Sequence, residues 1–192
     1  MKNLIFLPID IDLSELNFQQ SIDSDKSPGW INPNRPHWAA SWWDSSIITE
    51  ETIKKTKFDQ IIKQLPLTRI IRLTHKIQKK KVDPHLDCQP RGMVYDDGEY
   101  EHLKSTEPSG YRIVLSGSPN ALWIHDNKEW HNVKLPSVPC CYVLNSTAGY
   151  HKLDLDLGRE TIYLRGYVDL EKHQNLINRS LEKYKDYAVY FQ

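Results

Sequence analysis

The sequence predicts a fold that is mainly β with flanking helices, a β-sandwich or jelly roll. Three observations predict it. Short strand-like runs separated by turn signals fill the second half of the chain, and helical patterns occur only before and after them. The chain has 6 tryptophans and 10 tyrosines but only 2 methionines, which favours aromatic packing on strands. The sequence also lacks the strand–helix alternation of a nucleotide-binding sheet, together with GxGxxG, P-loop and GxSxG motifs.

The first third of the chain predicts one strand, an irregular segment and one helix. Apolar residues alternate along residues 5–13, which indicates an edge strand. Its short apolar run is broken by Pro8 and lacks a small-residue cleavage pattern, so we do not expect a signal peptide. Residues 14–48 are dense in Pro, Gly, Asn and Trp and predict an irregular segment that wraps the core. Residues 49–65 predict a helix that Pro66 ends.

The remainder predicts a β core and a final helix. The runs with strand character are 67–77, 111–117, 121–126, 140–146 and 160–169. Asp169 is a plausible N-cap for a helix whose apolar residues recur at helical spacing. A length of 192 residues suits one domain. We therefore expect a single domain over 1–192, with an N-terminal part (1–66), a jelly-roll core (67–169) and a C-terminal helix (170–192).

Charge and cysteine content exclude several classes of protein. The formal net charge is zero, so nothing indicates a general attraction to nucleic acid or to an anionic membrane. No apolar stretch is long enough to span a bilayer. Cys88, Cys140 and Cys141 form neither a disulfide framework nor a CxxC zinc site. These features predict a cytoplasmic protein in a reducing compartment, without membrane or nucleic-acid partners.

A short motif, "VDPHLDCQPRG", contains the first candidate site residues. It places His85 and Asp87 two positions apart in extended backbone, where side chains at that spacing point to the same side about 6.5–7 Å apart. Two histidines and one carboxylate on one face of Fe(II) leave positions open for a cosubstrate and dioxygen. The motif alone is weak, because a His-x-Asp/Glu match is expected by chance in such a chain. A third ligand has to come from another strand.

The third ligand is predicted to be His151. The candidates for this distal histidine are His102, His125, His131, His151 and His173. The other four fall on the final helix, in the loop directly after the motif or beside an exposed turn. His151 follows the strand at 140–146 and precedes a run that supplies Arg159 and Arg165. An arginine suits the carboxylate of a cosubstrate because its guanidinium binds carboxylates through two parallel hydrogen bonds.

These pieces resemble, in order and spacing, the aspartyl/asparaginyl β-hydroxylase branch of the Fe(II)/2-oxoglutarate-dependent oxygenases. "PHLD" resembles the first metal motif, "YRIVLSG" the following strand with Arg112, and "VLNSTAGYH" the strand and turn that lead to His151. "GRETIYLRGYVD" resembles the closing strand with Arg159. The resemblance covers roughly half of the chain. Some members of the branch lack the acidic ligand that Asp87 provides here, and Arg159 follows His151 slightly more closely than in such enzymes.

The resemblance implies a double-stranded β-helix, the cupin-like jelly roll, and a dioxygenase that hydroxylates an unactivated C–H bond. Fe(II) would be held by His85, Asp87 and His151. The cosubstrate 2-oxoglutarate would be anchored by Arg159, with Arg165 as the alternative. Further cofactor-binding roles are implied for Arg112 and Thr74. The substrate would be a small molecule or a peptide, such as an Asp or Asn side chain or an amino-acid-like compound, and no catalytic residue is expected beyond the metal ligands.

Two other functions remain open on the sequence. The first is a non-catalytic jelly-roll binding module, which metal content and 2-oxoglutarate binding would distinguish from an enzyme. The second is a cupin-type metalloenzyme that uses no 2-oxoglutarate, although cupins usually place more than one histidine in the first motif. His75 shares strand parity with Leu73 and is predicted to be a core histidine. Trp42 is predicted to cover the core or to line the substrate entrance.

Overall fold

The computed structural model describes residues 4–16, 42–48, 50–86, 106–146 and 149–192. They form two antiparallel sheets. The larger sheet contains β1 (Leu4–Pro8), β2 (Trp43–Ile47), β3 (Leu67–Gln78), β5 (Thr106–Ser116), β8 (Cys140–Leu144), β10 (Glu160–Asp169) and β11 (Val189–Tyr190). The smaller sheet contains β4 (Val82–His85), β6 (Leu122–His125), β7 (Trp130–Val133) and β9 (His151–Leu153). The helices are α2 (Glu50–Lys55), α3 (Phe58–Gln64), α4 (Leu170–Tyr184) and the 3-10 turn η2 (Lys185–Tyr187).

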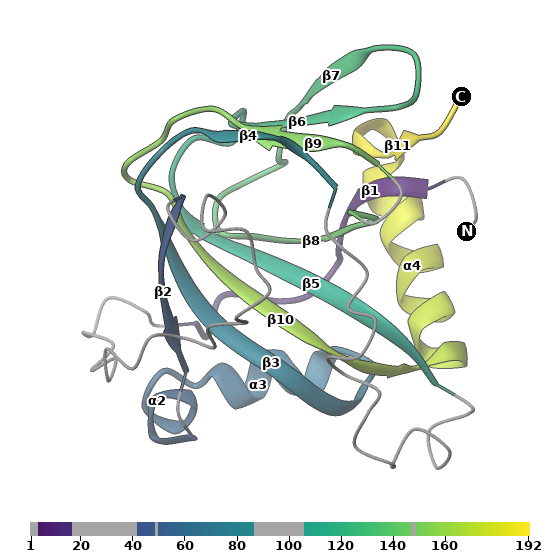
Figure 1. Ribbon diagram of the computed structural model, residues 1–192. Helices are drawn as coiled ribbons and strands as arrows, with labels where there is room; N and C mark the ends of the chain where they lie inside the picture. The colour runs from purple at the N-terminus through teal and green to yellow at the C-terminus, as the bar shows by residue number, and fades with distance from the viewer. Residues whose placement is uncertain (1–3, 17–41, 49, 87–105, 147–148) are drawn as a thin grey trace, which may run out of the picture.

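The order of strands is β11-β1-β8-β5-β10-β3-β2 in the larger sheet and β4-β9-β6-β7 in the smaller one. Figure 1 shows the smaller sheet above the larger sheet, with the helices toward the other side. The larger sheet thus has two covered faces. We call the face toward the smaller sheet the inner face, and the face toward α3 and α4 the outer face.

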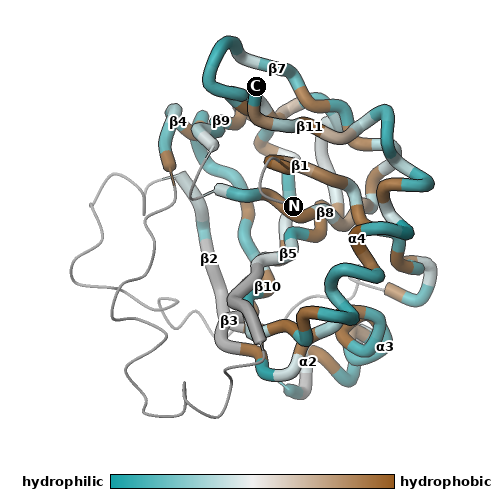
Figure 2. Tube along the Cα trace, turned by 90° about the vertical axis from the view of Figure 1, so that its right-hand side faces the viewer, coloured by the Kyte–Doolittle hydropathy of each residue, from teal (hydrophilic) through white to brown (hydrophobic). Residues whose placement is uncertain are grey.

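Each face carries its own hydrophobic cluster. On the outer face, Phe58 and Ile61 of α3 and Leu176 of α4 pack with sheet residues such as Ile113 and Ile162. On the inner face, the cluster joins both sheets; its members include Phe6, Val82, Val114, Leu122, Ile124, Cys140, Tyr142 and Leu153. β1 contributes to both clusters, and all five of its residues are buried. Figure 2 accordingly shows β1 as hydrophobic along its length.

The predicted class, mainly β with flanking helices, is confirmed. Each of the five predicted strand runs of the core contains a strand, and β3 and β10 match their predicted bounds to within a residue. Asp169 is the N-cap of α4, where its side chain accepts a hydrogen bond from the backbone N–H of Lys172 at 3.1 Å. The period-2 pattern was therefore informative for β3 and β10, and the capping signal for the start of α4.

Three predictions for elements outside the β core were wrong. β1 ends at Pro8 and is no edge strand, because β11 pairs with its other side. The predicted helix over 49–65 is two helices, broken at Lys57, whose φ of 56° lies in the left-handed region. The predicted C-terminal helix ends at Tyr184, and the chain then turns back to form β11. A two-residue strand leaves no periodic pattern to read, so only pairing with β1 defines it.

Besides β11, four strands in the described part of the chain were not predicted. β2 falls inside the segment expected to be irregular, and β4, β7 and β9 fall between the predicted runs. They have three to five residues and mixed polarity. Such short runs become strands through pairing with longer neighbours rather than through their own pattern. Three of the four form the smaller sheet, so the sequence predicted one of its four strands.

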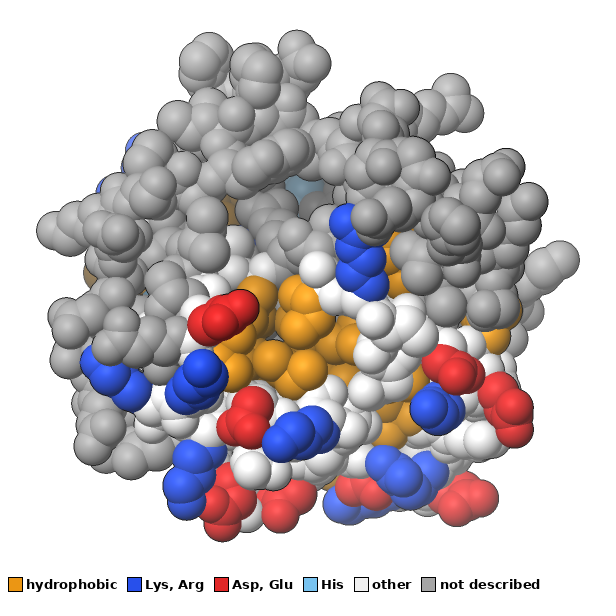
Figure 3. Space-filling model, turned by 90° about the horizontal axis from the view of Figure 1, so that it is seen from below, with side chains coloured by type: hydrophobic (Ala, Val, Ile, Leu, Met, Phe, Trp, Pro, Cys, Tyr) orange, Lys and Arg blue, Asp and Glu red, His pale blue; other side chains and the backbone are white. Residues whose placement is uncertain are grey.

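Seen from below, the molecule has hydrophobic side chains in the middle of the visible surface and acidic and basic side chains around them (Figure 3). Partly buried hydrophobic residues, including Leu13, Ile62 and Leu67, pack against the outer-face cluster. Among the residues that the structure describes, no helix is long and apolar enough to cross a membrane.

Candidate metal centre

Pairing of β4 with β9 brings together His85 and His151, which are 66 positions apart in the sequence. They face each other in the register, and their ring centroids are 4.3 Å apart at an interplanar angle of 48°. His151 shares a face of β9 with Leu153, a member of the inner-face cluster, so it points between the two sheets. Only 6% of His151 is exposed. The two predicted histidine ligands therefore lie side by side, His151 buried and His85 half-buried.

The Nδ1 atom of each histidine lies near a backbone carbonyl. His85 Nδ1 is 2.8 Å from the carbonyl oxygen of Asp83, and His151 Nδ1 is 3.4 Å from that of Gly149. When Nδ1–H donates to a carbonyl, the ring is in the tautomer whose Nε2 carries the lone pair. Metal-binding histidines are commonly oriented in this way. In that tautomer, Nε2 is the ring atom with which each histidine could bind a metal.

The ring of Trp42 also packs against the ring of His85. Their ring centroids are 4.7 Å apart, and Trp42 is buried. The carbonyl of Trp42 accepts the backbone N–H groups of Lys79 and Lys80, at 2.9 and 3.4 Å, which fixes its backbone beside the β3–β4 connection. Trp42 belongs to the inner-face cluster, as one of the two predictions for it required. It also limits the rotation of the His85 ring.

Asp87, the predicted carboxylate ligand, lies outside the described residues. Among the described residues alone, no group of three His, Cys, Asp or Glu side chains could hold a metal ion. Two of the three predicted ligands are placed together, and the third follows His85 by two positions. The two described histidines fit two ligands of such a metal, and Asp87 as the third ligand remains a prediction.

Arg159 directly precedes β10 and is buried, with 1% of its surface exposed. Its Nη1 donates to the carbonyl of Ser118 at 3.0 Å, whereas its Nη2 is buried without a hydrogen-bond partner in the described part of the chain. Burial raises the pKa of the nearby Cys140 thiol to about 12, and the positive charge of Arg159 partly opposes this rise. A buried guanidinium with an unused donor suits a carboxylate ligand.

Further buried polar atoms lie on the same face. Thr161 pairs with Val114, a member of the inner-face cluster, and Thr74 pairs with Tyr163 two positions along β10. We call Arg159 Nη2, Thr74 Oγ1, Thr161 Oγ1 and Gln78 Oε1 the inward polar set; within the described residues none of the four has a hydrogen-bond partner. Native structures leave few such atoms unsatisfied, so the set indicates a bound ligand or ordered water. Arg159 Nη2 and the hydroxyls of Thr74 and Thr161 can each donate a hydrogen bond to a carboxylate.

Thr161 and Gln78 were missed on the sequence. Thr161 could have been found, since it follows Arg159 by two positions in a strand and so shares its face. Gln78 carried no such signal. Its Nε2 donates to the carbonyls of Lys80 and Asp154, at 3.0 and 2.7 Å, which shows which end of the amide is the oxygen.

Arg112 and Arg165 lie farther along the same face. Arg112 donates from Nη2 to Ser146 Oγ at 3.1 Å, and its guanidinium lies 5.1 Å from the centroid of the Tyr163 ring. Lys76 Nζ is 4.9 Å from that centroid as well. Arg165 pairs with Gly110 of β5 and is only half-buried. Of the predicted arginines, Arg159 is the one enclosed in the interior.

The other described histidines belong to separate contacts. As predicted, His75 is a buried histidine, and its Nε2 lies 3.0 Å from Glu160 Oε2 on the outer face. His131 pairs with Asp126 at 2.8 Å, and His173 Nδ1 with the Tyr111 hydroxyl at 2.7 Å. His125 stacks edge-on against Trp130. His102 lies outside the described residues.

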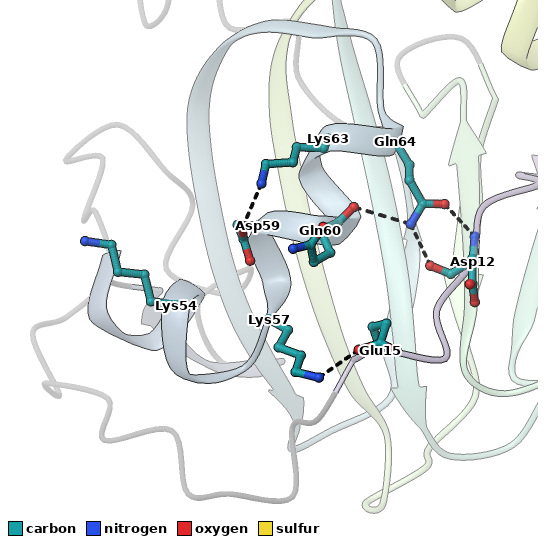
Figure 4. A pocket seen from close by; sticks show the side chains of 8 residues that line it. All are labelled: Asp12, Glu15, Lys54, Lys57, Asp59, Gln60, Lys63 and Gln64. Carbon is teal, nitrogen blue, oxygen red and sulfur yellow. Dashed lines mark hydrogen bonds and ion pairs between the residues drawn. The ribbon is translucent and has the colours of Figure 1, made fainter.

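A surface hollow beside α3 is a different feature (Figure 4). Its charged side chains neutralise one another through the exposed ion pairs Lys57–Glu15 at 2.8 Å and Lys63–Asp59 at 3.0 Å. Gln64 accepts the N–H of Asp12 at 2.7 Å and donates to its carbonyl at 2.8 Å. These contacts fasten the segment after β1 to α3, on the helix side of the larger sheet, and leave the inner face as the candidate site.

No protein-family model matches this chain, and no curated protein matches its sequence. The function therefore has to be argued from the paired histidines, the buried arginine and the inward polar set.

Proposed function

We propose that this protein is an Fe(II)/2-oxoglutarate-dependent dioxygenase that hydroxylates an unactivated C–H bond. The observation that carries the proposal is the pairing of His85 with His151 between the sheets, on the side of the larger sheet that also holds the buried Arg159. The two antiparallel sheets, with a common core between them, are consistent with a double-stranded β-helix. In that fold, ligands bind between the sheets.

His85, His151 and Asp87 would hold the metal. A set of two histidines and one carboxylate would leave the remaining positions on the metal open for a cosubstrate and dioxygen. Bound Fe(II) supplies the activation of dioxygen that protein side chains cannot provide. The chain's own part is to fix the two imidazoles through the carbonyls of Asp83 and Gly149 and through the ring of Trp42.

Arg159 would bind the far carboxylate of 2-oxoglutarate. Its Nη1 is held by the Ser118 carbonyl, so Nη2 is the donor that meets the ligand. Thr74 and Thr161 would each donate a hydroxyl hydrogen to the same carboxylate, and Gln78 Oε1 can accept from a hydroxyl or from water. Burial strengthens these bonds because water competes little for the donors.

Arg112 would face either the cosubstrate or the substrate. Ser146 and Tyr163 hold its guanidinium on the inner face, one strand away from β10. The substrate class proposed is an Asp or Asn side chain, or a small amino-acid-like compound, since a cationic group recognises its carboxylate or amide oxygen. We further propose a cytoplasmic location.

The test combines binding with turnover. Mn(II), and Fe(II) under anaerobic conditions, are titrated into the protein, followed by 2-oxoglutarate, and succinate formation is measured with ascorbate and dioxygen present. We expect one metal per chain, 2-oxoglutarate binding that depends on the metal, and slow succinate release without substrate. His85→Ala should remove all three. His75→Ala is the matched control, because this buried histidine contacts Glu160 on the outer face and should affect stability alone.

The alternative functions give other results. Metal binding without 2-oxoglutarate binding would contradict the proposal and indicate a cupin-type metalloenzyme. Binding of neither would indicate a non-catalytic module. Equal loss of turnover in folded His85→Ala and His75→Ala would contradict the placement of the site.

A further inference from the structure

Asp156, in the connection between β9 and β10, joins two chain segments that flank Arg159. Its Oδ2 accepts the backbone N–H of Ser118 in the β5–β6 connection, and its Oδ1 accepts the N–H of Gly158 at 3.3 Å. The carbonyl of Asp156 accepts the N–H of Arg159 at 3.0 Å. One acidic residue therefore contacts both the backbone that carries Arg159 and the segment whose carbonyl holds its side chain.

Neighbouring strands complete this arrangement. Ser116 Oγ, at the end of β5, donates to the carbonyl of Gly158 at 2.7 Å. The N–H of Gln78, at the end of β3, donates to the carbonyl of Arg159 at 3.0 Å. Since Arg159 Nη1 donates to the Ser118 carbonyl at 3.0 Å, the contacts form a closed chain from Asp156 to Ser118 to the guanidinium and back.

Gly117 allows these segments to approach closely. Its φ is +110°, a conformation that residues with a side chain rarely adopt. A Cβ atom at this position would lie 2.5 Å from Asp156 Oδ2 and 2.8 Å from the Cα of Arg159. The backbone of the β5–β6 connection therefore lies directly against the aspartate and the arginine.

We infer that Asp156 is a positioning residue for Arg159, an inference that rests on the proposed function. Arginine has many rotamers and loses much conformational entropy when it binds a ligand. Asp156 holds Ser118 in place, and Ser118 holds Nη1, so the guanidinium is already oriented before a carboxylate arrives. Loss of Asp156 should leave the cation in the site but release its orientation, which weakens cosubstrate binding without touching the metal ligands.

The test compares the affinities for metal and for cosubstrate in the full chain. Mn(II) is titrated by calorimetry into wild type and Asp156→Ala, and 2-oxoglutarate is then titrated into the Mn(II)-saturated proteins. We expect Asp156→Ala to raise the Kd of 2-oxoglutarate by about tenfold or more, the effect typical of losing an orienting partner. The Kd of Mn(II) should stay within about twofold of wild type, because His85 and His151 lie on other strands.

Asp126→Ala is the matched control. Asp126 also fixes a turn of the smaller sheet, where its Oδ1 accepts the N–H groups of Lys128 and Glu129, both at 2.9 Å. Its loss should lower the melting temperature yet leave both Kd values unchanged. A general loss of stability is thereby separated from a loss of orientation at Arg159.

Each of the following results would overturn the inference. If wild type binds 2-oxoglutarate and folded Asp156→Ala binds it equally well, Asp156 does not position Arg159, while the proposed function stands. If wild type binds Mn(II) but no 2-oxoglutarate, the inference fails together with the proposed function. Should Asp156→Ala not fold, Ser116→Ala removes one contact of the same network and should raise the Kd of 2-oxoglutarate by about threefold; an unchanged Kd there also overturns the inference.

Discussion

The two faces of the larger sheet bury polar side chains in different ways. On the outer face, these side chains make contacts with one another or with the backbone. Tyr111 pairs with His173, and Ser180 Oγ donates to the carbonyl of Leu176 at 2.7 Å and accepts the N–H of Asp10 at 3.0 Å. On the inner face, the inward polar set around Arg159 has no such contacts within the described residues.

This difference separates structural polar groups from a binding site. A buried polar group that is satisfied within the protein contributes to stability, whereas one left for a ligand costs free energy until the ligand binds. Burial raises the pKa of Tyr111 and lowers that of His173, so both are neutral around pH 7 and suit a structural role. Arg159, by contrast, is a buried cation. Folding does not require a buried charge, so its presence favours a role in binding.

The comparison is tested most strongly at the histidines. His151→Ala and His85→Ala should each weaken Mn(II) binding by at least about a hundredfold, because each removes a ligand atom. The measurement is calorimetric titration of Mn(II) together with the metal content of the purified protein. His173→Ala, on the outer face, should lose stability but keep its metal affinity. If His173→Ala loses metal while His151→Ala retains it, the inner face is not the metal site.

Arg159 gives the next largest effect. Arg159→Ala should raise the Kd of 2-oxoglutarate by at least about tenfold, which corresponds to roughly 1.4 kcal/mol of binding free energy. Arg165→Ala should do less, because Arg165 is half-buried and lies six positions farther along the chain. Titration of 2-oxoglutarate at saturating metal distinguishes the two. A loss confined to Arg165→Ala would move the anchor to Arg165.

Tyr111→Phe probes the outer face. It removes the hydroxyl that contacts His173 and leaves a buried ring nitrogen without this bond. The free energy of unfolding should fall by about 1–2 kcal/mol, measured by urea denaturation. The affinities for Mn(II) and 2-oxoglutarate should not change. A tenfold loss of either affinity would show that the two faces are coupled.

Much of the larger sheet could be predicted from the sequence, because β3 and β10 are long enough to show period-2 alternation. The breaks at Lys57 and Tyr184 could not, since a left-handed residue and a closing strand depend on tertiary contacts. Thr56 Oγ1 donates to the carbonyl of Thr52 at 2.6 Å beside this break, and neither glycine nor proline occurs there. The apolar residues keep their helical spacing across the break, so the sequence pattern predicts one helix instead of two.

Two residues that the sequence names as metal ligands lie together in the structure, but their surroundings were not predicted. His85 and His151 could be named because each stands beside a strand pattern or a motif, and their approach follows from β4–β9 pairing. The resemblance, rather than the pattern, supplied the role of Arg159. The contacts of Trp42, Gln78 and Asp156 could not be predicted, since they join segments distant in the chain without any fixed sequence spacing.

The smallest effect is expected at Thr161 on the inner face. Thr161→Val keeps the shape of the side chain and removes a buried hydroxyl of the inward polar set, so the free energy of unfolding of the apoprotein should stay equal or rise by up to about 1 kcal/mol. The Kd of 2-oxoglutarate should rise by about threefold. Thr56→Val is the matched control: its buried hydroxyl donates to Thr52, so this change should cost about 1 kcal/mol of stability and leave the Kd unchanged. Urea denaturation and calorimetry measure both variants. If Thr161→Val destabilises the apoprotein as much as Thr56→Val does, its hydroxyl has a structural role, and the distinction between the two faces fails at that position.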